Sequence, residues 1–376
     1  MLPIAPDRGK QVLNFLKANN TYNKFKVFDF LTAQTYLEPF TAKAVCTAKA
    51  VCKWSDSGFQ TDKYLLNRVD LERIHSGNYI SGLYGTDVED ALLKTFELID
   101  ENGKPNRYEP DSAVKPLSDL FNILLAQAGG TYLACLLALS RKRGFCYYLG
   151  GGMHHARYDA PSGFCLINDI TAAAFKILEK KEASLIWIID MDAHKGDGTA
   201  ELVHFARKRA AQKPGIEYPK SEIAAAQPDL KNEKPSVFTL SIHMEKGWPL
   251  DSENLASASE GRAPLLPSDV DIGIGRGEER EYTPRLAKGI QDLEKQSGKN
   301  PDFVIVVDGA DPYEHDGLSS SSLLRLTLEQ CLERDMYVYR YLQDRNISSA
   351  WVQSGGYGDR AWEPAAHFLN NIKKLE

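Results

Sequence analysis

The chain has 376 residues, of which 43% are hydrophobic and 26% charged, and its formal net charge is −6. This composition is typical of a globular protein, and the acidic balance gives no electrostatic basis for direct binding of nucleic acid. No signal peptide is visible and no apolar run approaches the ~20 residues of a membrane span, so we expect an intracellular, cytoplasmic protein without membrane contact.

The first part of the chain lacks a clear periodicity. Residues 7–19 and 71–80 are predicted to be helical, but the segment between them follows neither the helix period nor the strand period. That segment contains a tandem hexapeptide, Thr-Ala-Lys-Ala-Val-Cys, at residues 41–52. Two copies are too few for a solenoid, so we interpret them as a local duplication. The six cysteines form no Cys-x-x-Cys pair, which favours buried thiols over disulfides or a thiolate zinc site.

From residue 115 onwards, predicted helices alternate with predicted strands. The strands are short, almost entirely apolar runs at residues 145–149, 185–189, 237–240, 303–307 and 349–353. The helices are amphipathic segments at about 115–141, 167–181, 198–211, 283–297 and 321–344. Strands of this kind are buried on both faces, as in a parallel sheet covered by helices. We therefore predict a three-layer α/β/α fold with a central, mainly parallel sheet.

Polar or glycine-rich residues follow each predicted strand. They occupy residues 150–155, 190–198, 241–243, 308–312 and 354–357. Ligands of open α/β sheets bind outside the carboxyl ends of the strands, so we expect these segments to converge on one site. Because that site draws on residues across most of the chain, we predict a single catalytic domain over residues 1–376.

The segment after strand 185–189 contains candidate metal ligands. Alternate residues of an extended segment point the same way, so Asp192 and His194 can reach a common ion. Asp311 supplies a third ligand if its strand is a neighbour. One histidine and two carboxylates leave positions open for water and a substrate carbonyl, as catalytic zinc or another divalent ion requires. The alternative, in which these side chains only cap turns, does not account for the histidines at another strand end.

Two adjacent histidines, His154 and His155, lie in the glycine-rich segment after strand 145–149. A histidine that takes a proton from water at a metal needs a carboxylate behind it to fix its tautomer. Asp190 and Asp197 are not needed as ligands, so they are the natural partners. The pattern predicts two His–Asp dyads beside one ion, as a metal-assisted hydrolase would require.

Five motifs occur in order along the chain, at residues 151–156, 162–169, 189–198, 309–311 and 355–357. Together they resemble the zinc-dependent histone deacetylase family, the arginase-like deacylases that include acetylpolyamine amidohydrolases and acetoin-utilisation proteins. The resemblance covers about residues 71–365. It implies hydrolysis of an acyl-lysine amide, with an acylated lysine peptide or protein as the partner and histones among the candidates.

The resemblance also implies residue roles. Asp192, His194 and Asp311 would hold one zinc ion per chain. His155, with Asp197 behind it, would be the general base and acid, with His154 and its partner Asp190 beside it, and the scissile carbonyl would receive a hydrogen bond from Tyr357. The acyl-lysine channel would be lined by Gly152, Phe164, Trp248 and Leu318. A monovalent cation, potassium, would be held by Asp190, Asp192, His194, Ser241 and the backbone of Ile242.

The chain departs from the family pattern at several places. Lys195 stands where relatives often carry a second histidine, and we expect it to face away from the metal. Trp248 replaces the usual phenylalanine, and its bulk could alter acyl or peptide preference. The polar residues 206–235 are predicted to form a surface insertion.

Three alternative functions remain open. The chain could deacetylate acetylpolyamines or other small acyl-amines. A ureohydrolase of the same architecture would carry two manganese ions, but it needs an Asp where this chain has Gly196. A non-catalytic homologue would bind acyl-lysine through the retained pocket, although every expected catalytic group is present.

Overall fold

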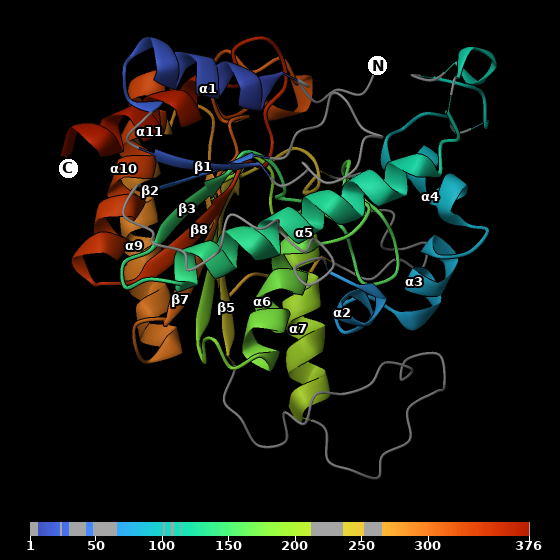
Figure 1. Ribbon diagram of the computed structural model, residues 1–376, viewed down its shortest axis with the longest axis horizontal. Coiled ribbons are helices and arrows are strands. Elements are labelled where there is room, and N and C mark those ends of the chain that lie inside the picture. The colour runs from blue at the N-terminus through green and yellow to red at the C-terminus, as the bar shows by residue number, and fades with distance from the viewer. Residues whose placement is uncertain are drawn as a thin grey trace.

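A central sheet lies between helices in the computed structural model of the chain (Figure 1). The structure describes residues 7–22, 25–29, 43–47, 66–100, 102–106, 109–113, 115–211, 236–251 and 265–375. The α-helices described are α1 (Arg8–Ala18), α2 (Arg68–Glu72), α3 (Gly77–Leu83), α4 (Val88–Thr95), α5 (Asp119–Leu139), α6 (Asp169–Glu179), α7 (Asp197–Ala211), α9 (Tyr282–Ser297), α10 (Leu328–Asp344) and α11 (Glu363–Leu375). Short 3-10 helices lie at η3 (Pro110–Ser112), η5 (Glu279–Glu281) and η6 (Ser319–Ser321).

The described strands form one sheet in the order β1-β2-β3-β8-β7-β4-β5-β6. They are β1 (Phe25–Asp29), β2 (Lys43–Thr47), β3 (Phe145–Tyr148), β4 (Ile186–Asp190), β5 (Val237–Met244), β6 (Val270–Ile274), β7 (Phe303–Val307) and β8 (Ser348–Val352). From β3 to β6 the pairing is parallel throughout, whereas β1 and β2 add antiparallel strands at one edge. The predicted mainly parallel sheet is confirmed.

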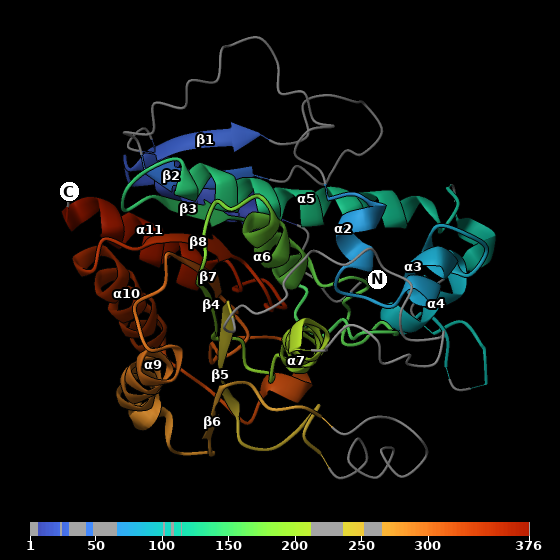
Figure 2. The same cartoon turned by 90° about the horizontal axis from the view of Figure 1, so that it is seen from below.

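Alternate side chains of the buried strands pack into different helical layers. In β4, Ile186 and Ile188 pack toward the layer of α5, α6 and α7, whereas Trp187 and Ile189 pack toward α9, α10 and α11. Figure 2 shows these two groups of helices on opposite sides of the sheet. The two hydrophobic cores confirm the three-layer α/β/α architecture.

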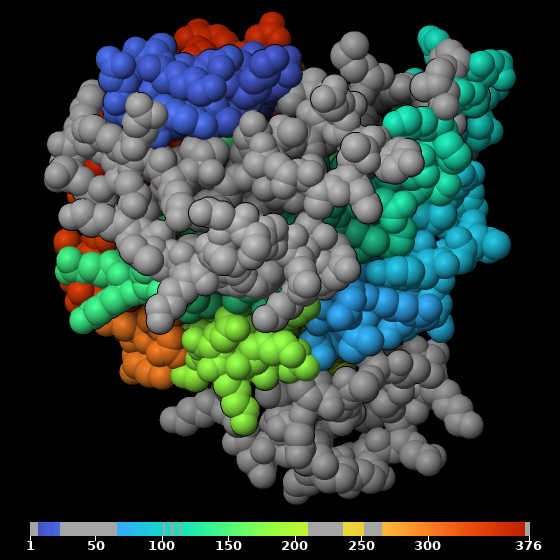
Figure 3. All heavy atoms as spheres, viewed as in Figure 1, coloured from blue at the N-terminus to red at the C-terminus, as the bar shows by residue number. Residues whose placement is uncertain are grey.

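Some helices differ from the prediction because capping residues interrupt the apolar period. The predicted helix over 71–80 is divided between α2 and α3. The Ser76 hydroxyl accepts a hydrogen bond from the Tyr79 amide at 3.2 Å, and this contact caps the start of α3. The predicted helix over 321–344 starts only at α10, where Thr327 and Gln330 form a capping box. Helix α11 was not predicted, and it packs against α1. Figure 3 shows α1, in blue, at the top of the view, with red residues of the C-terminal part of the chain behind it.

Helix α5 departs from the expectation that no apolar segment approaches the length of a membrane span. Within the described part of the chain, it is the one helix that is long and apolar enough to cross a membrane. More than half of that apolar stretch is buried, and α5 packs against α6, β3 and β8. Its hydrophobicity is accounted for by its position in the core.

Two segments singled out in the sequence are only partly described. Residues 43–47 of the tandem hexapeptide form β2, and the rest of the repeat lies outside the described residues. Helix α7 extends to Ala211, so the first six residues of the predicted insertion, 206–211, continue a helix. Residues 212–235 lie outside the described residues.

The parallel centre of the sheet should be the most sensitive part of the fold. Ile305, fully buried in the central strand β7, leaves a cavity when truncated, so we expect Ile305→Ala to lower the free energy of unfolding by about 2–5 kcal/mol. Val69 is 49% exposed, and Val69→Ala serves as the control, with an expected change within about 0.5 kcal/mol. Denaturant unfolding measures both, and equal losses would contradict this assignment of the core.

Candidate metal centre and active site

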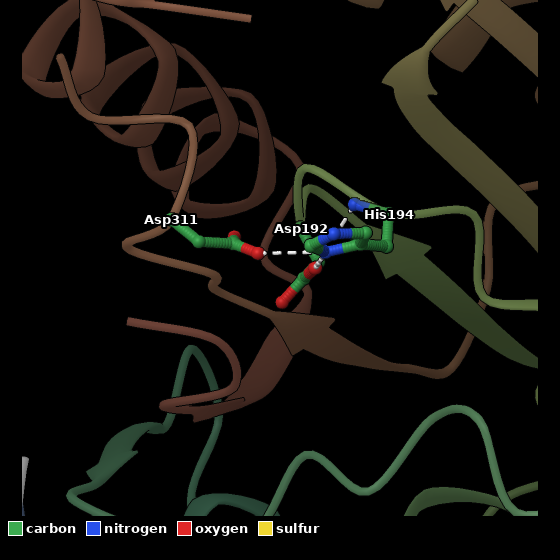
Figure 4. Close-up of side chains that lie close together, drawn as sticks. All are labelled: Asp192, His194 and Asp311. Atoms are coloured by element: carbon green, nitrogen blue, oxygen red, sulfur yellow. Dashed lines mark hydrogen bonds and ion pairs between the residues drawn. The ribbon is translucent and has the colours of Figure 1, made fainter. Parts of the chain in front are cut away.

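Three potential metal ligands converge at the carboxyl ends of two adjacent strands. Asp192 and His194 follow β4, and Asp311 follows β7, which pairs directly with β4. Their ligand atoms all lie within 4.8 Å of one another, and all three residues are buried. Figure 4 shows the side chains pointing toward one another from two separate loops. The expectation that these strands are neighbours is confirmed.

The hydrogen bonds of His194 orient it toward the two carboxylates. Its Nδ1 lies 2.9 Å from Asp311 Oδ2 and 3.3 Å from Asp192 Oδ1. Its Nε2 lies 3.2 Å from the hydroxyl oxygen of Ser320. When Nε2 carries the ring proton and donates it to this hydroxyl, Nδ1 is left as an acceptor. In that tautomer, three buried electron-pair donors face one point, and a shared cation is needed to balance them.

The pKa shifts reflect the same crowding of negative charge. Burial and the charge of Asp192 raise the pKa of Asp311 to about 6. Burial lowers the pKa of His194, but its hydrogen bonds to both carboxylates outweigh burial and raise the value to about 10. A proton on His194 therefore supplies the balancing charge when no metal does. One nitrogen and two carboxylate groups are a donor set that divalent metals bind, so the residues fit a metal ion.

Backbone groups fix the second oxygen of each carboxylate. The Gly355 amide donates to Asp192 Oδ2 at 2.8 Å, and the Ala193 amide donates to Asp311 Oδ1 at 3.0 Å. A side chain at position 355 would place its Cβ 2.6 Å from Asp192 Oδ2, so only glycine permits this approach. The carboxylates are thereby oriented before any ligand binds.

Both predicted His–Asp pairs are present in the structure. His154 Nδ1 lies 2.7 Å from Asp190 Oδ2, and His155 Nδ1 lies 2.7 Å from Asp197 Oδ1. Asp190 ends β4 and Asp197 begins α7, so the two carboxylates flank the metal-ligand loop. The imidazole rings of the two histidines lie 3.9 Å apart, centroid to centroid.

The pKa values of the two histidines are shifted in opposite directions. Burial lowers the pKa of His154, but the charges of Asp190 and Asp192 outweigh it and raise the value to about 9. Burial and the adjacent charge of His154 lower the pKa of His155 to about 4, despite its bond to Asp197. These opposite shifts favour a charged His154 and a neutral His155, which can accept a proton at Nε2 while Nδ1–H donates to Asp197.

Tyr357 is held on a glycine-rich loop after β8. Its amide donates to Asp316 Oδ2 at 2.6 Å, and its carbonyl accepts from the Gly317 amide at 2.6 Å. Burial raises the pKa of the Tyr357 phenol well above its ordinary value, with a further contribution from the nearby charge of Asp311. The phenol therefore remains a hydrogen-bond donor at neutral pH.

Two residues that hold this loop were not predicted from the sequence. Arg8 of α1 is buried, and its guanidinium donates to the carbonyls of Gln353 at 2.8 Å and Ser354 at 2.6 Å. Asp316 binds both the Tyr357 amide and, at 2.9 Å, the Leu318 amide. No motif contains Arg8, which lies 346 residues from Ser354 in the sequence.

The predicted channel residues occupy loops around the metal ligands. Gly152 has a positive φ of 79°, which glycine adopts readily, and its carbonyl accepts from the Ser354 hydroxyl at 2.9 Å. The half-buried ring of Phe164 lies 6.1 Å from that of Tyr357, and the half-buried Trp248 lies 4.5 Å from His155. Leu318 is half-buried next to Asp316. Their contact with substrate stays a prediction.

The remaining sequence expectations concern Lys195 and the monovalent cation. Lys195 Nζ lies 2.5 Å from Asp271 Oδ1 on β6, so its charge is directed away from the ligand cluster, as expected. In the predicted cation site, Asp190 pairs with Ser241 across β4 and β5, and Asp190 Oδ1 accepts from the Asp192 amide at 3.1 Å. Potassium binding stays a prediction.

Residues 37–371 match the family model of the histone deacetylase domain, so the chain belongs to the histone deacetylase family. An uncharacterized protein of Picosynechococcus is 30% identical over 234 residues, which is 62% of this chain and 62% of that protein. Histone deacetylase 2 of Arabidopsis thaliana is 24% identical over 330 residues, which is 86% of this chain and 71% of the relative. Acetoin utilization protein AcuC of Staphylococcus aureus is 34% identical over 306 residues, covering 78% and 64% respectively.

The fold is also found among solved structures. An acetylpolyamine aminohydrolase from Burkholderia pseudomallei matches with a TM-score of 0.54 at 16% identity, covering 82% of this chain and 84% of that chain. At this identity the match shows the arginase/deacetylase-like fold alone. The family match and the shared fold agree in assigning the chain to the histone deacetylase family.

Substitutions should separate the metal ligands from the dyad carboxylate. Asp192→Ala and Asp311→Ala each remove a ligand, so we expect loss of both metal and activity. Asp197→Asn keeps the ligands but misorients His155, so we expect metal retention and a fall in kcat of roughly 10²-fold. Metal analysis and peptide turnover test this, and full zinc occupancy in Asp311→Ala would overturn the ligand set.

Trp248 should act as a wall for the methylene stem of the substrate lysine. Its ring lies beside both His155 and His194, with centroids 4.5 Å and 5.6 Å away. We therefore expect Trp248→Ala to raise KM roughly tenfold while changing kcat comparatively little. Trp362, which packs on Phe15 at 5.6 Å, gives the control: Trp362→Ala should lower Tm only. An unchanged KM with a lower Tm in Trp248→Ala would refute the wall assignment.

Proposed function

We propose that the chain is a zinc-dependent deacylase that removes acetyl or related acyl groups from lysine side chains of proteins. The observation that carries this proposal is the convergence of a neutral His155, backed by Asp197, with the buried Asp192–His194–Asp311 cluster. The proposed partner is an acylated lysine peptide or protein, without direct contact to nucleic acid or membrane.

Asp192, His194 and Asp311 would hold one zinc ion, since their nitrogen and oxygen donors suit that metal and leave coordination positions for substrate and water. Zinc bound there would polarise the amide carbonyl and lower the pKa of a water molecule toward ~7. The remaining steps fall to the side chains around the cluster.

His155 is placed to take the proton of the attacking water. Its low pKa keeps the imidazole neutral, and Asp197 stabilises the imidazolium that forms. The Tyr357 phenol, protonated at neutral pH, donates a hydrogen bond to the developing oxyanion. A protonated histidine then returns a proton to the leaving lysine amine, so that the C–N bond breaks and a carboxylate and free lysine are released.

A second candidate is deacetylation of polyamines or other small acyl-amines. It is favoured by the names of two matches, an acetoin utilization protein at 34% identity and a structural neighbour named as an acetylpolyamine aminohydrolase. A ureohydrolase is disfavoured, because a single candidate metal cluster, with three ligands, is found in the described parts of the chain. The candidates differ in the substrate they turn over.

A substrate panel on the zinc-loaded protein decides between the two. The panel compares the rates of hydrolysis of acetyl-lysine peptides, longer acyl-lysine peptides and acetylated polyamines at equal concentration. We expect the acetyl-lysine peptides to be hydrolysed faster than the acetylated polyamines. His155→Ala is the control for contaminating activity. Faster hydrolysis of acetylpolyamines would contradict the proposed protein substrate and favour the second candidate. The absence of turnover of every acyl-amine would contradict the enzymatic function.

Removing the phenol of Tyr357 tests its role in catalysis. We expect Tyr357→Phe to keep zinc bound and to lower kcat by roughly 10²–10³-fold, the scale of losing one oxyanion donor. Phe164→Leu, on the facing channel wall, is the comparison variant because it should change KM more than kcat. A kcat of Tyr357→Phe within about threefold of wild type would contradict the role of Tyr357 as an oxyanion donor.

A further inference from the structure

A charged side chain outside the family motifs lies directly beneath the metal-ligand loops. Arg334 belongs to α10, and its side chain is fully buried, with 0% exposure. Moving a guanidinium out of water is costly unless its charge and its hydrogen bonds are satisfied. The partners of Arg334 therefore indicate why the charge is kept there.

One nitrogen of Arg334 bridges the two loops that carry the metal ligands. Nη1 donates to the carbonyl of Met191 at 3.1 Å and to the carbonyl of Gly309 at 3.1 Å. Met191 directly precedes Asp192, and Gly309 lies two residues before Asp311. A change in the position of Nη1 would thus change the separation of the two carboxylate ligands.

The other nitrogens of Arg334 anchor the guanidinium. Nη2 donates to Asp308 Oδ1 at 2.6 Å, and Nε donates to Asp335 Oδ1 at 2.7 Å. The Tyr147 hydroxyl donates to the second oxygen of Asp308 at 2.6 Å. All four residues are buried, so the guanidinium plane is held by rigid contacts from β3, α10 and the loop after β7.

We propose that Arg334 is a positioning residue of the metal centre, which sets the separation of the loops that carry Asp192 and Asp311. The inference rests on the proposed function, in which this cluster binds zinc. Arginine suits the task because its planar fork supplies donors in several fixed directions at once. A lysine ammonium at this position could pair with Asp308, but it could not also satisfy both carbonyls and Asp335 in one plane.

Zinc affinity of the full chain provides the test, because it is read without turnover. Zinc would be titrated into metal-free protein in competition with a chromophoric chelator, and Tm would be recorded in parallel. Arg207 gives a matched control, since its guanidinium also binds a carboxylate, that of Asp269 at 2.7 Å, and a backbone carbonyl, that of Val237. We expect Arg334→Lys to weaken zinc binding by roughly 10–100-fold. Arg207→Lys should leave the zinc affinity within about threefold of wild type, even if both variants have a lower Tm.

A second variant keeps the test decisive if Arg334→Lys does not fold. Asp335→Ala leaves Arg334 in place but removes the acceptor of its Nε, and we expect weaker zinc binding in the same direction. Zinc affinity equal to wild type in Arg334→Lys or, should that variant not fold, in Asp335→Ala would overturn the proposal. A wild-type chain that binds zinc but hydrolyses no acyl-amine would contradict the proposed function alone.

Discussion

The candidate active site is organised around two like-charged carboxylates that are buried close together. Asp192 and Asp311 would repel each other strongly in a low-dielectric interior, and the imidazole of His194 faces both of them. Burial lowers the pKa of His194, but its hydrogen bonds to both carboxylates raise the value to about 10, so a proton on this imidazole balances their charge at neutral pH. A divalent cation at this point would neutralise the repulsion and displace the proton.

The parallel sheet brings these groups together, and buried arginines hold them there. Because β4, β7 and β8 are adjacent and parallel, their carboxyl ends place the ligand loops and the Tyr357 loop side by side. Arg8 binds the carbonyls of the Tyr357 loop, and Arg334 binds those of both ligand loops. Each guanidinium also places positive charge near a site rich in carboxylates. The helical layers on the sheet therefore contribute to the site as well as to the core.

The fold was predictable where the chain is regular. The apolar runs in β3, β4 and β7 predict buried segments, whereas β6 mixes Asp271 and Gly273 with apolar residues at the sheet edge and was not predicted. The convergence of Asp192, His194 and Asp311 was predictable because these residues follow adjacent strands of the sheet. Arg8 and Arg334 were not, because an arginine in a polar helix favours a solvent-exposed position, and their partners lie 346 and 143 residues away.

The central claim is that one zinc ion in the Asp192–His194–Asp311 cluster supports amide hydrolysis by His155. Titration of zinc into metal-free protein, with hydrolysis of an acetyl-lysine peptide followed at each addition, tests it most directly. The account predicts that activity is absent without metal, rises in proportion to added zinc and reaches its maximum at one ion per chain. Activity that is independent of zinc, or that needs a second ion per chain, would contradict it.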